Sequence, residues 1–302
     1  MATHHPLEHT ALARLGARAV AREDPAYPRG LCDLADAPPV VFVRGGPIPA
    51  WETMVALVGS RAASPYGVRQ AGRLAGDLAR LGLTVVSGLA RGIDAASHRG
   101  ALEAGGRTIA VLPSGLDDVT PRHHRELAEE IAARGALLSE IASGPPRYRA
   151  DFVTRNRLIA SLAAATVVVE AATRSGALST AAAARRVGRP VLAVPGDLDR
   201  DTAAGCHALL RAGARLCTGA ADVLAALPRQ TKDSGAPADP APGAAARLLE
   251  ALEVEPRSIE TLAAAARLDV AEALAELLAL EWAGVVESRP GQRWARPPRP
   301  RR

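Results

Sequence analysis

The chain has 302 residues, of which 48% are hydrophobic, and a formal net charge of +5. This length suits one large domain or a medium domain with a smaller companion, and the hydrophobic fraction is ample for a core. The modest basic excess is compatible with a polyanionic partner such as nucleic acid but is not diagnostic of one.

The cysteine pattern limits the cellular compartment and the kinds of site. Cys32, Cys206 and Cys217 lie far apart and form no CxxC pair, which argues against a disulfide framework and a zinc site and fits a reducing cytosol. The chain shows no basic start followed by an apolar run, and no apolar stretch approaches the length of a membrane span. We therefore expect a cytoplasmic protein with no bound metal and no membrane partner.

Residues 1–50 are interpreted as an N-terminal extension and a lead-in segment, and residues 51–228 as the main domain. In the main domain, short runs rich in Val, Leu and Ile alternate with segments of helical spacing. The expected strands are 55–58, 83–87, 108–112, 136–140, 166–170 and 190–194. Apolar strands joined by helical crossovers indicate a parallel sheet covered on both faces. The predicted fold class is therefore α/β, a Rossmann-like, doubly wound, mostly parallel sheet.

Two further segments and a tail follow the main domain. Residues 229–243 are polar and rich in Pro, Gly, Ala and Asp, which predicts a linker. Residues 244–296 show the order helix, helix, helix, hairpin, which is that of a small C-terminal winged-helix domain. Residues 297–302 form a basic tail.

The expected third helix of the winged-helix domain is acidic. It carries Glu272, Glu276 and Glu281 and no Arg, so it would face the phosphates of a duplex unfavourably. This argues against a transcription factor that reads duplex DNA through that helix. Contact with a protein and a solvated acidic face both remain as interpretations.

Glycine, serine and arginine follow the ends of most expected strands of the main domain. The segments concerned are Gly59-Ser60-Arg61, Ser87-Gly88, Pro113-Ser114-Gly115, Ser175-Gly176 with Thr180, and Pro195-Gly196-Asp197. Ligands of open parallel sheets bind at the carboxyl ends of the strands. Glycine lets backbone N–H groups approach a phosphate, hydroxyls add donors, and arginine adds a charged fork. A tight turn explains any one of these glycines as well, but five such loops at one edge favour an anion site.

An aromatic residue stands amid arginines in residues 147–157. The residues of interest there are Arg147, Tyr148, Arg149, Phe152, Arg155, Asn156 and Arg157. This mixture suits single-stranded nucleic acid, because bases stack on rings and guanidinium groups bind phosphates. Asn156 would hydrogen-bond a base edge or hold a loop. The alternative is that Phe152 anchors a loop to the core and that Arg155 pairs with an acid.

Catalytic and cofactor motifs receive little support. The chain has neither GxGxxG after its first strand nor GxxxxGK[ST], so we expect no dinucleotide and no Walker A nucleotide cofactor. Asp94 and His98 have the spacing of a catalytic or metal pair, but we favour a helix cap for Asp94 and local packing for His98. The pair His123-His124 is interpreted as a loop or a helix start.

Seven segments occur in an order that resembles a known family. They are VALVGSRAASPYG, VVSGLARGIDAASHRGAL, TIAVLPSGLD, LLSE, FVTRNRLIA, VVVEAATRSGALSTAAAA and GRPVLAVPGD. Over roughly residues 51–219, the chain closely resembles the DNA-processing protein A family, also called DprA or Smf. The resemblance implies a Rossmann-like domain that binds single-stranded DNA without chemistry, protects incoming DNA in natural transformation and helps to load the RecA recombinase. It also implies a homodimer.

The resemblance assigns the nucleic-acid site to residues that match the motifs of the family. Together with the residue-level arguments above, it gives the candidate binding residues Gly59, Ser60, Arg61, Ser87, Gly88, Arg149, Phe152, Arg155, Asn156, Arg157, Ser175, Gly176 and Thr180. Phosphates are expected on the Gly59-Ser60-Arg61 and Ser175-Gly176 loops, with charge from Arg149 and Arg155. No catalytic residue is expected.

The main alternative is a nucleotide-processing enzyme. The Rossmann-like phosphoribohydrolases, which cleave the base from nucleoside monophosphates, also place glycine loops at strand ends, but they carry PGGxGTxxE. The corresponding segment here is TRSGALSTAAA, with no PGG and no Glu after the Thr. Because that catalytic acid is missing, we expect a binding protein and not an enzyme.

Overall fold

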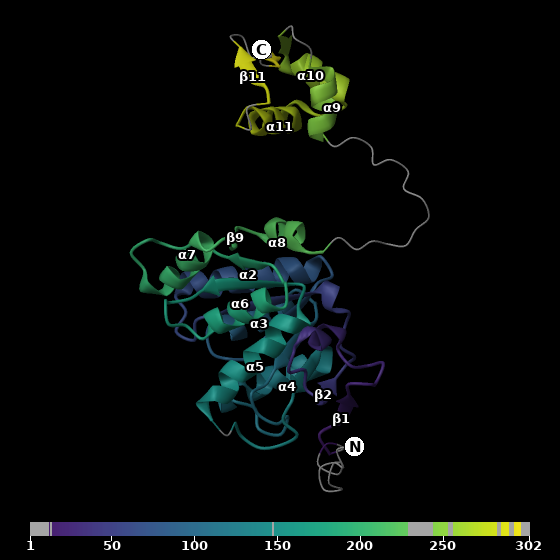
Figure 1. Ribbon diagram of the computed structural model, residues 1–302, viewed down its shortest axis with the longest axis vertical. Coiled ribbons are helices and arrows are strands. Elements are labelled where there is room, and N and C mark those ends of the chain that lie inside the picture. Colours follow the sequence, from purple (N-terminus) through teal and green to yellow (C-terminus); the bar gives the residue numbers. More distant parts are fainter. Residues whose placement is uncertain are drawn as a thin grey trace. The chain divides into compact units, whose positions relative to one another are not determined.

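The computed structural model describes residues 12, 14–146, 148–228, 244–252, 256–282, 285–289 and 293–296. The chain divides into two compact units, residues 1–230 and residues 231–302, and each is described by itself (Figure 1). The predicted linker 229–243 and basic tail 297–302 lie outside the described residues. In the described part of the chain, no helix is both long enough and apolar enough to cross a membrane.

A nine-stranded sheet forms the centre of the larger unit (Figure 1). Its strands in chain order are β1 (Ala17–Ala21), β2 (Val40–Gly45), β3 (Met54–Gly59), β4 (Thr84–Ser87), β5 (Thr108–Val111), β6 (Ala136–Ser139), β7 (Ala165–Glu170), β8 (Val191–Ala193) and β9 (Arg215–Leu216). Their order in space is β1-β2-β6-β5-β4-β3-β7-β8-β9. Neighbours from β6 to β9 pair in parallel, whereas β2 pairs antiparallel with β6 and with β1. The predicted mostly parallel α/β sheet is confirmed.

Three strands of the sheet were not among those expected. Strands β1 and β2 form an antiparallel hairpin, in which Ala19 pairs with Phe42, so the sheet begins ahead of residue 51. Strand β1 is an edge strand with mostly exposed or half-buried side chains, and it has no continuous apolar run. Strand β9 has two exposed residues. Such short edge strands exist because a neighbour offers backbone partners, and their own side chains give little signal.

Helices cover both faces of the sheet. They are α2 (Pro65–Arg80), α3 (Ile93–Glu103), α4 (Arg125–Arg134), α5 (Arg149–Leu162), α6 (Ala177–Arg186), α7 (Ala204–Arg211) and α8 (Ala220–Ala226), with short 3-10 turns η1 (Arg29–Asp33), η2 (Trp51–Thr53), η3 (Arg122–His124) and η4 (Asp201–Ala203). Alternate residues of each strand point to opposite faces. Thus Met54 and Ala56 of β3 pack with α5 and α6, whereas Val55 and Leu57 pack with α2 and α3.

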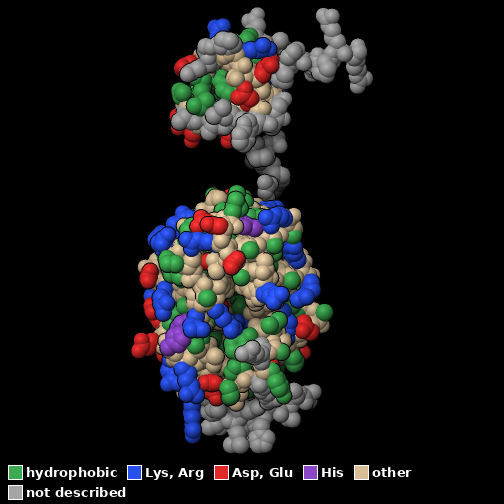
Figure 2. Space-filling model, turned by 90° about the vertical axis from the view of Figure 1, so that its left-hand side faces the viewer, with side chains coloured by type: hydrophobic (Ala, Val, Ile, Leu, Met, Phe, Trp, Pro, Cys, Tyr) green, Lys and Arg blue, Asp and Glu red, His purple; other side chains and the backbone are tan. Residues whose placement is uncertain are grey.

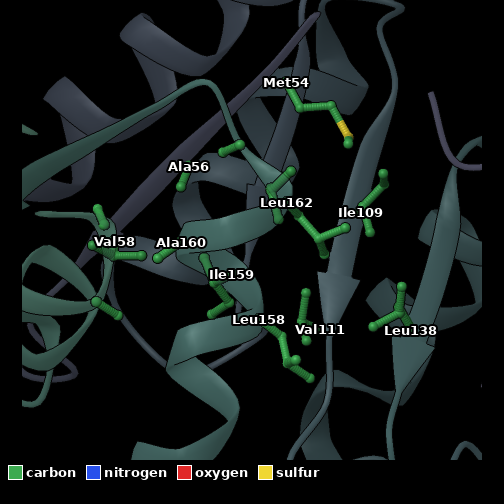
Figure 3. Packing of buried hydrophobic residues seen from close by; sticks show 14 of the residues in the cluster. Met54, Ala56, Val58, Ile109, Val111, Leu138, Leu158, Ile159, Ala160 and Leu162 are labelled. Atoms are coloured by element: carbon green, nitrogen blue, oxygen red, sulfur yellow. The ribbon is translucent and has the colours of Figure 1, made fainter. Parts of the chain in front are cut away.

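Helix α5 illustrates how the core holds the elements that carry the candidate site. Figure 3 shows Leu158, Ile159 and Leu162 of this helix directed at strand residues such as Ile109 and Val111. All five side chains are at most 1% exposed. Burying each large aliphatic side chain contributes about 1.5–3 kcal/mol, so the second half of α5 is firmly attached to the sheet.

The smaller unit has the predicted winged-helix order. It contains α9 (Ala244–Ala251), β10 (Arg257–Ser258), α10 (Ile259–Ala266), α11 (Val270–Trp282), β11 (Glu287–Arg289) and β12 (Arg293–Ala295). Its sheet has the order β10-β12-β11. Ser258 caps α10 as expected, because its side chain accepts a hydrogen bond from the backbone N–H of Thr261. Leu248, Leu262 and Trp294 are among the residues of its core.

The direction of strand addition reverses between β3 and β7. Strands β4 to β6 extend the sheet on one side of β3, and β7 to β9 extend it on the other. The chain leaves β3 toward α2 on one face and leaves β7 toward α6 on the opposite face. The two connections therefore diverge at the carboxyl ends of the strands. This is the place where open α/β sheets hold their ligands.

Candidate nucleic-acid interface

A cleft of about 870 Å³ lies at the carboxyl ends of β3 and β7. The candidate residues that line it are Gly59, Ser60, Arg61, Phe152, Arg155, Asn156, Ser175, Gly176 and Thr180. They come from the end of β3 and the loop after it, the loop after β7, and helices α5 and α6. The fold thus brings together three sequence segments that were singled out separately.

The loop after β3 is fixed by its backbone. The Ser60 N–H donates to the carbonyl oxygen of Glu170 at 2.7 Å, and the Ser60 carbonyl accepts from the N–H of Ile93 at 3.2 Å. A Cβ at Gly59 would lie 2.5 Å from Cγ1 of Ile93, so only glycine fits there. The loop is held between the end of β7 and the start of α3, and it carries the exposed side chain of Arg61 into the cleft.

Glu170 is a structural residue that the sequence analysis did not identify. It is the last residue of β7, and its carboxylate accepts hydrogen bonds from both the N–H and the hydroxyl of Ser64, each at 3.0 Å. Ser64 in turn caps α2 by accepting from the N–H of Gly67. The buried carboxylate therefore attaches the start of α2 to the end of β7. A carboxylate just before a glycine-rich loop was the available sequence signal.

The loop after β7 leads into the N-terminus of α6. Asn156 donates from Nδ2 to the carbonyl oxygen of Gly176 at 3.2 Å and to Oγ of Ser179 at 2.9 Å. Of the two roles predicted for it, these hydrogen bonds fit the one in which Asn156 holds a loop, here the loop after β7. Gly176 is exposed, and a Cβ there would meet no atom within 4 Å. The backbone of this loop is thus open to a ligand beside the positive end of the α6 dipole.

Arg155 does not lie where the sequence analysis expected it. It lines the floor of the cleft but is only 4% exposed. Its Nη1 donates to the carbonyl oxygens of Gly88, at 2.9 Å, and Val111. A guanidinium that is buried against two backbone carbonyls is not available as the main phosphate ligand. Its contacts instead tie helix α5 to the ends of β4 and β5.

Asp94 is the charge that balances Arg155. Its Oδ2 accepts from the N–H groups of Gly88 and Ala90 at 3.2 and 3.3 Å. Burial lowers the pKa of Arg155 to about 10, and the attraction of Asp94 works against that shift. Burial raises the pKa of Asp94, while Arg155 acts in the opposite direction. Arg155 thus interacts electrostatically with an acid, while its direct hydrogen bonds go to backbone carbonyl oxygens.

Three other candidate residues, whose side chains or backbone are described, do not line the cleft. Arg157 forms ion pairs with Asp36 at 3.0 Å and Glu140 at 2.6 Å. Ser87 is fully buried, with its hydroxyl donating to a backbone carbonyl, and Gly88 lies beneath the Arg155 guanidinium. The side chain of Arg149 and the whole of Arg147 lie outside the described residues. Arg157 and Ser87 thus interact with other protein groups, and the Arg155 guanidinium covers Gly88.

Phe152 and Arg61 meet at the cleft. The Phe152 ring is half-buried, and the guanidinium carbon of Arg61 lies 4.9 Å from its centroid. Both residues line the cleft, so the ring projects from α5 away from the strand-facing side of that helix. Arg174, which sequence reasoning missed, lines the cleft beside them and is exposed. It lies directly before Ser175, in the loop whose serine and glycine predict an anion site.

Two of the five loops expected at the ligand edge serve other purposes. Ser114 is buried, and its hydroxyl donates to the carbonyl oxygen of Asp118. The carbonyl oxygen of Gly196 lies 3.0 Å from a ring nitrogen of His207. Neither loop lines the cleft. A Cβ at Gly115 would lie 2.3 Å from Cα of Ser143, and one at Gly196 would lie 2.8 Å from Cβ of Ala203, so close packing accounts for these two glycines.

The histidine and aspartate pairs form no metal site in the described residues, where no group of three His, Cys, Asp or Glu side chains could hold a metal ion. His98 is completely buried and its Nδ1 lies 2.7 Å from Oγ1 of Thr108, so it packs locally as expected. The expected helix cap at Asp94 is wrong, because Gly92 is the N-cap residue of α3 and Asp94 accepts instead from the loop in front of that helix. His123 and His124 lie in η3, the short helical start before α4.

The charged surface of the larger unit is mainly basic in the view of Figure 2. Arginine side chains (blue) are spread over much of that face, and acidic side chains (red) are fewer. All blue atoms drawn are arginine, because the single lysine, Lys232, lies outside the described residues. A surface of this kind attracts polyanions over distances of about a Debye length, roughly 8–10 Å at physiological salt.

The sequence also matches a characterised family. Residues 18–228 match the family described as DNA recombination-mediator protein A, and residues 232–292 match the DprA winged helix domain. The chain belongs to the DNA recombination-mediator protein A family. The resemblance that the sequence motifs suggested is thereby confirmed.

Members of the DNA recombination-mediator protein A family show how far the likeness extends. The putative DNA processing protein DprA of Mycobacterium tuberculosis is 44% identical over 248 residues, which cover 79% of this chain and 63% of that protein. This chain therefore corresponds to less than two thirds of that relative. Protein Smf of Synechocystis is 35% identical over 317 residues, covering 91% of this chain and 79% of that protein.

Two solved structures of DNA processing protein A share the fold. That of Streptococcus pneumoniae has a TM-score of 0.66 at 36% identity and covers 73% of this chain and 78% of its own. That of Helicobacter pylori has a TM-score of 0.62 at 26% identity, with coverages of 70% and 96%. The latter structure is described as giving insight into the single-stranded DNA binding mode of the Helicobacter pylori protein.

Proposed function

We propose that the chain is a single-stranded DNA-binding recombination mediator whose larger unit holds the strand in the cleft at the ends of β3 and β7. The observation that carries this proposal is the pairing of an exposed cation with a half-buried ring, Arg61 over Phe152, beside two glycine loops. Single strands need such a combination, since their phosphates require charge and their bases require a stacking surface. The binding mode described for the Helicobacter pylori relative supports the same ligand class.

Each part of the cleft has a distinct role in this proposal. Arg61 and Arg174, both exposed, contact phosphates, and the open backbone at Gly176 receives a phosphate at the start of α6. Phe152 stacks on one base. Arg155 touches no DNA and keeps the surrounding loops in place through its bonds to backbone carbonyls.

The wider role follows from the family. In the cytoplasm, the chain protects incoming single-stranded DNA during natural transformation, helps to load RecA onto it, and acts as a homodimer. The winged-helix unit contacts a protein and does not read duplex DNA through α11, because Glu272 and Glu276 on that helix would repel phosphates. These assignments rest on the resemblance and on family membership.

The cleft is a binding site and not a catalytic one in this proposal. Among the described residues that line it, Asp94 is the one carboxylate. It is buried and accepts two backbone hydrogen bonds, so it is not placed to activate water against a nucleotide. This argues against the phosphoribohydrolase alternative, which requires a free catalytic acid.

A titration with fluorescent oligonucleotides tests the proposal. The full chain should bind a single strand more tightly than a duplex of the same sequence, and its affinity should fall linearly on a log–log plot against salt concentration. Arg61→Ala should weaken the binding, while Arg80→Ala, on the surface of α2 and paired with Asp77, should leave it unchanged. Equal affinity for the two DNA forms, or hydrolysis of AMP abolished by a substitution in the cleft, would contradict the proposal.

A further inference from the structure

A second groove, of about 350 Å³, lies between α2 and α3. It is next to the cleft, because a single short loop contributes to both. Ala90 and Asp94 line the cleft, whereas Arg91, Gly92 and Ala95 line the groove. Because these residues follow one another along the chain, the cleft and the groove adjoin at this segment.

Small residues form the floor of this groove. Gly72 of α2 and Gly100 of α3 both line it, and a Cβ at Gly100 would lie 2.2 Å from the carbonyl oxygen of Gly72. The helices therefore approach each other through their backbones. Ala96 and the 42% exposed side chain of Val68 add apolar surface. A floor of this kind is flat enough to receive the face of a base.

Two uncommitted arginines line the groove. Arg91 lies in the loop and Arg99 on α3, both exposed, and neither takes part in a hydrogen bond or an ion pair within the described part of the chain. Arg73, one helix face away, instead donates to Gln70 and to the carbonyl oxygen of Thr218. The groove thus presents two arginines whose charge is not paired within the described part of the chain.

We propose that the groove between α2 and α3 continues the single-stranded DNA site, with Arg91 and Arg99 contacting phosphates on the side of residues 90–94 away from the cleft. This inference rests on the proposed function, since it requires a strand in the cleft. The strand passes from the cleft over Gly92 and lies along α3. Bases rest on the floor and the backbone follows the arginines.

The other side of the cleft is a poorer continuation. A smaller pocket there is lined by Arg157, Arg186 and Asp36. Arg157 is already paired with Asp36, so Arg186 is the free charge of that pocket in the described residues. The groove between α2 and α3 has two free arginines and one carboxylate, that of Glu103, among its described lining residues, so it carries more unpaired positive charge than this pocket.

Acidic side chains beyond the groove limit how far the DNA strand follows the surface. Beyond Arg99 the lining includes the carboxylates of Glu103, Glu126 and Glu130. Three acidic side chains repel the phosphates of a strand that continues further. The extension is consequently short, and Arg99 provides its last favourable contact.

Binding to oligonucleotides of graded length tests this path, from about 4 to about 16 nucleotides, the range of site sizes seen in compact single-strand-binding domains. The Arg91→Ala, Arg99→Ala double variant should match the parent on the shortest strands. It should bind the longer ones roughly 2- to 30-fold more weakly, as expected for two exposed ion pairs. On the longer strands its salt slope should fall by about 0.7 per lost contact. Arg186→Ala is the matched control and should behave as the parent at every length.

The outcomes separate this inference from the proposed function. If Arg61→Ala weakens binding at all lengths but the double variant matches the parent even on long strands, the cleft binds DNA and the groove does not. If the double variant weakens short and long strands equally, or Arg186→Ala shows the length-dependent loss, the path is wrong. If the parent chain binds single-stranded and duplex DNA equally well, and Arg61→Ala binds both as the parent does, the proposed function itself is wrong.

Discussion

The guanidinium carbon of Arg61 lies 4.9 Å from the centroid of the Phe152 ring, so the loop after β3 and the first half of α5 meet at the cleft. A contact of this kind contributes about 0.5–1 kcal/mol at an exposed site. It also orders a long side chain before any ligand arrives, which reduces the entropy lost on binding. The pair thus presents a positive charge and an aromatic ring at a defined distance from each other.

Replacing the charge of this pair should change the salt dependence of binding. Arg61→Ala removes one phosphate contact, so the slope of log affinity against log salt should become shallower by about 0.7 for a single strand. The loss should be the same for every base sequence, because phosphates carry no sequence information. Titration at several salt concentrations measures both effects. Parent-like binding of Arg61→Ala at all of them would place the site elsewhere.

Replacing the ring should change affinity without changing the salt slope. Phe152→Ala removes a stacking surface worth roughly 1–3 kcal/mol per base, and it leaves the number of phosphate contacts intact. Phe152→Trp keeps an aromatic face and should retain most of the affinity. The same titrations measure this. A variant that lowers only the melting temperature would show that Phe152 serves as a core anchor.

Gly176 allows binding to be tested apart from stability. Its φ is −60°, and a Cβ there meets no atom within 4 Å, so Gly176→Ala fits the fold without strain. Stability should be unchanged or should rise by about 0.4–1 kcal/mol, because alanine restricts the unfolded chain. DNA binding should weaken, since a methyl group then stands where a phosphate approaches the backbone. Thermal melts and titrations on one preparation measure both, and unaltered binding would remove this loop from the site.

The loop at Gly92 is the matched contrast to Gly176. Gly92 has a φ of +77°, and a Cβ there would lie 2.3 Å from the carbonyl oxygen of Ser60. Gly92→Ala should therefore lower the melting temperature, in contrast to Gly176→Ala. A variant of Gly92 that melts like the parent would show that the loop relaxes more readily than its geometry indicates.

Asp94 and Arg155 should behave as a coupled buried pair. Arg155→Met removes the positive charge that acts on Asp94 and leaves two buried carbonyl oxygens without this donor, so it should lower the free energy of unfolding by about 1–3 kcal/mol. Combining it with Asp94→Asn should cost less than the sum of the two single changes, because the amide carries no charge. Urea-induced unfolding of the four proteins gives the coupling free energy. If the two changes in the free energy of unfolding simply add in the double variant, the two residues do not interact energetically.

Acid should destabilise the larger unit through His98. Burial lowers the pKa of His98 to about 3, whereas the same group in the unfolded chain titrates near 6.5. Below about pH 6.5 His98 is protonated in the unfolded state but stays neutral in the folded state. The free energy of unfolding therefore falls by up to about 1.4 kcal/mol per pH unit as the pH is lowered, until the folded pKa is reached. This loss is absent above the unfolded value.

The His98→Gln variant isolates this contribution. It lacks the titrating group, so the stability difference between the parent and the variant should shrink as the pH is lowered from about 7 to about 5. Urea unfolding followed by circular dichroism at each pH measures the difference. A difference that stays constant with pH would show that His98 is not held neutral in the fold.

The sequence by itself determined the architecture and the segments that form the site. Apolar strands alternating with helical segments predicted the parallel sheet, since burial on both faces leaves a recognisable run of Val, Leu and Ile. Glycine after a strand predicted loops at the carboxyl edge, and those at Gly59 and Gly176 do line the cleft. Short edge strands such as β1 and β9 escaped prediction because their stability comes from a neighbour's backbone.

Only the tertiary structure decided which of the predicted polar residues are free to meet a ligand. Arg61 and Arg155 are chemically identical in the sequence, yet one is exposed and the other is 4% exposed. The difference arises because Arg155 meets the carbonyl oxygens of Gly88 and Val111, which are 67 and 44 residues away along the chain. A guanidinium is satisfied by whatever acceptors surround it. Those acceptors are set by packing between distant strands, and no local pattern of residues records them.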